Sequence, residues 1–165
     1  MIDRRKTITY LVTIFSTYML VVLSIQIIAP DEKILPENFP ESCPEKSRNC
    51  SFIGPESFRS GGLIELRFDT SMENTLLEAR KWIESQPRTK ILGNWESQNH
   101  YVFETQFFRF PDDFVINAHC ENEQTVLYVY SESRIGVSDL GVNEDRITEF
   151  ADYMSEAEMP TSECT

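Results

Sequence analysis

The longest apolar stretch of the sequence lies near its N-terminus. No charged side chain occurs between Thr7 and Pro30, and most residues there are branched or aromatic. About 20 helical residues at a rise of about 1.5 Å each span about 30 Å, the thickness of the hydrocarbon core of a bilayer. The pattern therefore predicts a transmembrane helix over residues 7–29, which would hold the chain in a lipid bilayer.

The charges on either side of this stretch predict its orientation. Basic residues precede it and acidic residues follow it, namely Arg4, Arg5 and Lys6, then Asp31 and Glu32. By the positive-inside rule, residues 1–6 are cytoplasmic and everything after Pro30 is extracytoplasmic, as in a single-pass membrane protein. A cleaved signal peptide is the alternative, but its apolar region normally has about 7 to 15 residues and ends in a small-x-small site. The longer run favours an uncleaved anchor.

Residues 30–60 contain five of the eight prolines and few apolar residues, which predicts an extended linker. Cys43 and Cys50 lie within it, and two nearby cysteines in an extracytoplasmic, turn-rich segment predict a local disulfide. Cys120 and Cys164 are left either to pair with each other or to remain free. The alternative is a metal site formed by Cys43, Cys50, Cys120 and His119, although the spacing matches no C-x-x-C pattern.

Residues 61–156 show the short alternating segments of a small α+β domain. Residues 62–68 alternate as a half-buried strand does. Thr70 and Glu73 have the spacing of a capping box, which predicts a helix that ends before Pro87. The apolar face of this helix consists of Met72, Leu76, Ala79 and Ile83.

Four further strands are predicted near residues 89–96, 100–110, 113–120 and 125–131. A last helix begins at Asn143 as its N-cap, with an apolar stripe of Ile147, Phe150, Ala151 and Met154. The order β-α-β-β-β-β-α predicts a mostly antiparallel sheet with one face covered by the two helices. The aromatic residues are assigned to the core and the sheet face, among them Trp82, Trp95, Tyr101, Phe103, Phe107 and Phe108. Residues 157–165 are predicted to be an acidic flexible tail.

The net charge of the chain limits the kinds of molecule that it can bind. The chain of 165 residues has 15 basic and 27 acidic side chains, a net charge of -12. Such an acidic surface repels phosphate backbones, which excludes sequence-independent nucleic-acid binding. With 41% hydrophobic residues, the chain can form one domain with a real core. No G-x-G-x-x-G motif or P-loop occurs, so no nucleotide cofactor is predicted.

One polar cluster of candidate residues runs from the end of a strand to the start of the last helix: Ser133, Arg134, Ser138, Asp139 and Asn143. The N–H groups at a helix N-terminus and an arginine suit a small anionic ligand. The structural alternative is that Asp139 and Asn143 cap turns and that Arg134 pairs with Asp112 or Asp113.

A second candidate pair is Asp112-Asp113. Adjacent carboxylates could bind a divalent cation or act in acid–base chemistry, whereas aspartates after a proline are also ordinary turn residues. His100 is predicted in a hairpin turn and His119 near a strand end, and neither has a nucleophile in a recognisable motif.

Three segments resemble the uncharacterised family called domain of unknown function 1499. They are the cysteine segment Cys43–Cys50 with Ser51, the strand and turn at residues 107–113 (FFRFPDD), and the run at residues 131–143 (SESRIGVSDLGVN). The resemblance covers residues 40–155. It implies a small domain that is attached to a membrane helix or exported, and it implies no particular activity or ligand.

Three functions from different classes follow. The first is a non-catalytic, membrane-tethered binding or assembly module that holds a protein partner or a small anionic ligand through residues 133–143. The second is a hydrolase or isomerase that uses Asp112, Asp113 and Asp139 with Arg134, which predicts a raised carboxyl pKa. The third is a metal-handling structural protein in which the cysteines are ligands.

Overall fold

The computed structural model describes residues 3–31, 34–35 and 37–164. The predictions that touch Met1, Ile2, Glu32, Lys33, Pro36 and Thr165 lie, for those positions, outside the described residues. Helix α1 (Arg4–Ile28) begins after Asp3, whose side chain accepts a hydrogen bond from the Arg5 N–H at 3.0 Å. Its most apolar window has a mean hydropathy of 2.2 and none of it is buried, so α1 is long and apolar enough to cross a membrane. A signal sequence meets the same criteria.

The rest of the chain forms an α+β domain, which confirms the predicted class. Its sheet is antiparallel, with strand order β1-β6-β5-β4-β3 and with β2 also beside β6. The elements follow one another as β1 (Cys50–Ile53), β2 (Leu66–Phe68), α2 (Met72–Ser85), β3 (Thr89–Asn94), β4 (Gln98–Glu104), β5 (Pro111–Glu121), β6 (Gln124–Ser133) and α3 (Val142–Glu156).

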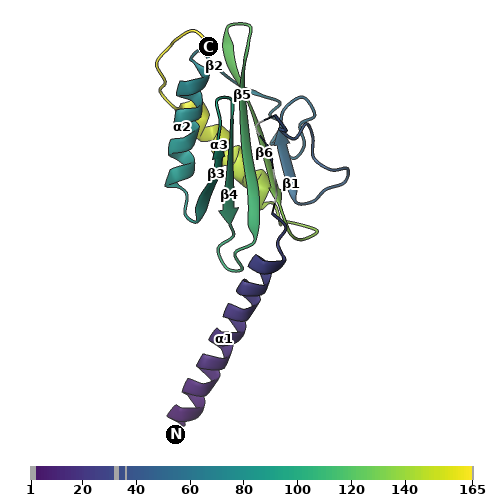
Figure 1. The fold of residues 1–165 in the computed structure, drawn as a ribbon, viewed down its shortest axis with the longest axis vertical. Helices are drawn as coiled ribbons and strands as arrows, with labels where there is room; N and C mark the ends of the chain where they lie inside the picture. Colours follow the sequence, from purple (N-terminus) through teal and green to yellow (C-terminus); the bar gives the residue numbers. More distant parts are fainter. Residues whose placement is uncertain (1–2, 32–33, 36, 165) are drawn as a thin grey trace.

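Helices α2 and α3 lie on one face of the sheet, and α1 extends from one end of the domain (Figure 1). The predicted apolar stripe of α3 is buried as expected, and so are Leu76, Ala79 and Ile83 of α2. Trp82 packs edge-on against Phe150 with ring centroids 5.2 Å apart, and it also contacts Phe114 of β5. A smaller cluster on the opposite face joins Phe52, Val115 and Tyr130 to Ile34.

The linker prediction for residues 30–60 needs a correction, because β1 lies within this range. Cys50–Ile53 is fully buried and pairs with β6, so the domain begins before residue 61. The strand predicted over residues 62–68 is shorter in the structure, where β2 has only three residues. The reason is that β1 and β2 pair with the same edge of β6, so each occupies only part of that edge. The N-cap of α2 is Ser71, which accepts from the Asn74 N–H, rather than Thr70.

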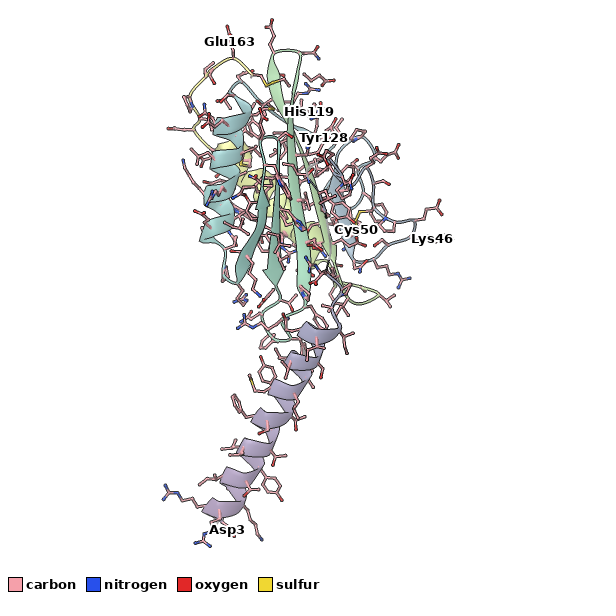
Figure 2. The ribbon with its side chains drawn as sticks, viewed as in Figure 1. Asp3, Lys46, Cys50, His119, Tyr128 and Glu163 are labelled. Carbon is pink, nitrogen blue, oxygen red and sulfur yellow. A yellow bond between two sulfur atoms is a disulfide. The ribbon has the colours of Figure 1, made fainter. Side chains whose placement is uncertain are left out.

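Both cysteine pairs are disulfides. The predicted Cys43–Cys50 bond is present, and Cys120 pairs with Cys164. The second bond corrects the prediction of a flexible tail, because it ties the C-terminal segment to β5. The Thr70 hydroxyl also donates to the Pro160 carbonyl at 2.6 Å, and the Ser71 N–H to the Ser162 hydroxyl at 2.9 Å. Figure 2 shows Glu163 and His119 at the end of the domain away from α1.

Candidate functional site

The paired aspartates lie in a strand, not in the predicted turn. Asp112 and Asp113 are the second and third residues of β5, and both are buried. Neighbouring residues of a strand point to opposite faces of the sheet. Asp112 therefore faces the helices and Asp113 the other side, so the two carboxylates do not form one cation site. The turn lies earlier, at residues 105–110, where the Phe110 N–H donates to the Thr105 hydroxyl at 2.9 Å.

On the helix face, Asp112 belongs to a buried polar network. Arg146 of α3 donates through Nη2 to Asp112 Oδ2 at 2.7 Å and stands 4.7 Å from the centre of the Phe103 ring. Asn143 Nδ2 donates to the Ser133 hydroxyl at 3.0 Å, and the Ser131 hydroxyl donates to Asn143 Oδ1 at 2.6 Å. The network fastens α3 to the ends of β5 and β6.

On the opposite face of the sheet, the Asp113 carboxylate is hydrogen-bonded to an arginine and to a histidine. Arg134 donates to Oδ2 at 2.8 Å through Nε and to Oδ1 at 2.7 Å through Nη2, while His100 Nε2 lies 2.6 Å from Oδ1. Burial acts to raise the pKa of the Asp113 carboxyl, but the hydrogen bonds from His100 and Arg134 outweigh it and hold the pKa below its ordinary value. His100 is buried in β4, so its predicted place in a hairpin turn is wrong.

The N-terminus of α3 already holds a carboxylate. Helix α3 begins at Val142 after Gly141, so Asn143 lies inside the helix and is not its N-cap. Asp139 accepts from the Gly141 N–H at 3.0 Å and from the Asn143 N–H at 2.9 Å. These bonds and Arg59 outweigh burial and lower the pKa of the Asp139 carboxyl. An external anion at this position would have to displace Asp139, while Ser138 is exposed beside it.

The 105–110 loop and the 135–142 segment lie at the end of the domain from which α1 extends (Figure 1). A cavity of about 380 Å³ lies between them. Phe107, Phe108 and Leu140 form its apolar wall, and Ser133 and Asp112 contribute polar groups. Oδ2 of Asp112 is paired with Arg146, but Oδ1 is buried and accepts no hydrogen bond from the described part of the chain. The cavity therefore has an apolar wall, and the unpartnered acceptor lies buried within Asp112, one of its lining residues.

The structure brings Asp112, Ser133 and Asn143 together on one face, and Asp113 and Arg134 on the other. The pairing of Arg134 with Asp113 is the structural alternative raised from the sequence. Arg146 was missed, although it follows Asn143 by three residues and so shares its helix face. Among the described residues, no group of three or more His, Cys, Asp or Glu side chains is placed to hold a metal ion, and all four cysteine sulfurs are in disulfides.

The lowered pKa of Asp113 predicts a loss of stability in acid. Its ion pair stabilises the fold above the unfolded pKa of about 3.9, and this stabilisation is lost as the pH falls through the lower folded pKa. Below about pH 4, we expect the free energy of unfolding to fall less steeply with pH in the Asp113→Asn variant than in the wild type. The two slopes should differ by at most about 1.4 kcal/mol per pH unit, the value for one proton. Denaturant unfolding at successive pH values, followed by tryptophan fluorescence, measures the slope. An unchanged slope would mean that Asp113 does not titrate with unfolding.

A family model described as "Protein of unknown function (DUF1499)" matches residues 41–154. This range contains β1 to β6, α2 and nearly all of α3, and it contains the whole cavity. The search of curated proteins gives no match to the chain.

Proposed function

The chain belongs to the DUF1499 family of proteins of unknown function, and we propose that it is a membrane-anchored binding module whose domain is extracytoplasmic. The apolar α1 supports the anchor, with Arg4 and Arg5 at its start and Asp31 after its end. The two disulfides support the location, because such bonds form and persist in oxidising compartments.

The observation that carries the binding role is the apolar cavity, one of whose lining residues, Asp112, keeps a buried and unpartnered Oδ1. A buried polar atom without a partner costs about 1 to 3 kcal/mol. A ligand that donates a hydrogen bond to this oxygen would recover that free energy, and the apolar wall would bury the rest of the ligand. The cavity is within the size range of small-molecule sites, about 300 to 1,000 Å³.

The carboxylates of the cluster favour binding over catalysis. A general acid needs a pKa near the working pH. The pKa values of Asp113 and Asp139 are instead lowered by their hydrogen bonds and arginine partners, which opposes the raised pKa that the enzyme hypothesis requires. These groups hold loops and helix ends in place.

We expect a Ser138→Trp variant to lose a bound molecule that the wild-type chain retains. Ser138 is exposed on the cavity wall, so an indole there fills the cavity without disturbing the core. The full chain is extracted from the membranes of an exporting host in mild detergent, and native mass spectrometry compares its mass with the mass after denaturation. The matched control is Val137→Trp, in the same loop but outside the cavity wall.

An adduct that is present in the wild type and in Val137→Trp, and absent in Ser138→Trp, supports the proposal. A bare wild-type mass, or an adduct that survives Ser138→Trp, would overturn it. Recovery of a second protein in place of a small molecule would redirect the function toward assembly.

A further inference from the structure

The two loops that frame the cavity expose large apolar side chains. Phe107 is 69% exposed, Phe108 48%, Val137 85% and Leu140 93%. These side chains form what we call the apolar rim. The sequence pattern predicts that Phe107 and Phe108 lie in the core or on the sheet, and this is wrong, because both lie in a loop and are exposed. Exposed apolar side chains that gather in one place are typical of interaction surfaces.

The loops of the apolar rim also lack the acidity of the rest of the chain. The net charge of the protein is -12, yet residues 105–110 and 135–142 contain one basic and one acidic residue, Arg109 and Asp139. The Asp139 side chain is only 2% exposed and is paired with Arg59. The surface that the rim presents is therefore mainly apolar, with one half-buried cation, Arg109, whose Nη1 lies 3.8 Å from the Glu104 carboxylate.

Contacts with α1 bring the 105–110 loop of this rim alongside that helix. The Tyr18 hydroxyl donates to the Phe107 carbonyl at 2.7 Å, and Gln26 donates to the Arg109 carbonyl. Tyr18 precedes the end of α1 at Ile28 by ten residues. At about 1.5 Å per residue this is about 15 Å, or half of a hydrocarbon core of about 30 Å. If α1 spans the membrane, Phe107 lies among the acyl chains of the outer leaflet and Arg109 lies near the headgroups.

We propose that the apolar rim inserts into the outer leaflet and that the cavity takes a membrane amphiphile from it. An acyl chain packs against Phe107, Phe108 and Leu140. A hydroxyl or ammonium headgroup enters below this wall and donates to the buried Asp112 Oδ1. This inference rests on the proposed binding function and specifies its ligand. A headgroup that is itself an anion is disfavoured, because a carboxylate has no proton to donate to the Asp112 Oδ1 acceptor.

The first experiment measures the depth of the rim. A Phe107→Trp variant of the full chain is reconstituted into phosphatidylcholine vesicles whose acyl chains carry bromine, which quenches nearby tryptophan. The matched control is Leu77→Trp on α2, which is 53% exposed and lies on the outer surface of the domain. We expect the fluorescence added by Phe107→Trp to be quenched and that added by Leu77→Trp to persist. No quenching of Phe107→Trp would overturn insertion.

The second experiment identifies the headgroup. The full chain in phosphatidylcholine nanodiscs is offered a monoacylglycerol or a fatty acid of the same chain length, and retention is measured by native mass spectrometry. We expect the monoacylglycerol to be retained about tenfold better, which corresponds to about 1.4 kcal/mol. Ser138→Trp should abolish this retention, and Val137→Trp should preserve it. Equal retention, or a preference for the fatty acid, would overturn the headgroup assignment.

Different results would refute the binding function and the assignment of a membrane amphiphile as its ligand. A water-soluble adduct that Ser138→Trp removes would uphold the binding function and refute an amphiphile from the membrane. Quenching of Phe107→Trp without any molecule lost on Ser138→Trp would leave the rim in the membrane and refute the binding function.

Discussion

Replacing Arg146 by methionine is expected to lower the free energy of unfolding by about 3 to 5 kcal/mol, because it leaves a buried charge without its partner. Arg146 is buried, and its Nη2 donates to Asp112 Oδ2 at 2.7 Å. Asp112 is fully buried, so water cannot replace the guanidinium. The measurement is denaturant unfolding of the full chain in one detergent, followed by near-UV circular dichroism.

The matched control is Arg80→Met, which removes an exposed arginine that pairs with Glu84 on α2. Exposed ion pairs of this kind contribute little, so its unfolding curve should stay close to that of the wild type. The double variant Arg146→Met/Asp112→Asn should recover part of the loss, because it removes the uncompensated charge as well. A loss at Arg146 as small as at Arg80 would mean that the buried pair does not hold α3 to the sheet.

Elements with strong periodicity could be predicted from the sequence. The faces of α2 and α3 follow the 3.6-residue repeat, and Leu76, Ala79 and Phe150 are buried as expected. Strand β1 could not be predicted, since its four residues follow a proline-rich stretch and pair with β6 far along the chain. Its order depends on that long-range pairing, which leaves no local pattern.

The aromatic run at residues 107–110 shows a second limit. Phe107 and Phe108 continue the apolar character of β4, so an apolar pattern alone assigned them to a strand. The chain leaves the sheet after Glu104, and a loop closes where the Thr105 N–H donates to the Phe110 carbonyl at 3.0 Å. Local sequence cannot distinguish an exposed apolar loop from an apolar strand that is buried in the core.

The sequence predicts most residues of the candidate site, but it does not predict how they are arranged. Pro111-Asp112-Asp113 has the composition of a turn. Two arginines on opposite faces of the sheet override this preference, since Arg146 binds Asp112 and Arg134 binds Asp113. Each arginine lies far from the aspartates in sequence, and β4 and β6, which pair with β5, are separate segments of the chain, so the local sequence does not show that these residues form a strand.

Replacing both Cys120 and Cys164 by serine is expected to lower the free energy of unfolding by about 4 kcal/mol on the chain-entropy estimate. This bond closes a loop with a sequence separation of 44, whereas Cys43–Cys50 has a separation of 7. The same relation gives about 2.5 kcal/mol for the shorter loop. Unfolding of the two double-serine variants, compared under non-reducing conditions, measures both losses.

The order of the two losses tests what each disulfide does. A larger loss for Cys120/Cys164 follows from the longer loop, which fastens the segment after α3 to the end of β5. A larger loss for Cys43/Cys50 would contradict the loop-length argument. It would show that the Cys43–Cys50 bond acts chiefly by holding the buried Cys50 and Phe52 against β6, which stabilises the native packing rather than restricting the unfolded chain.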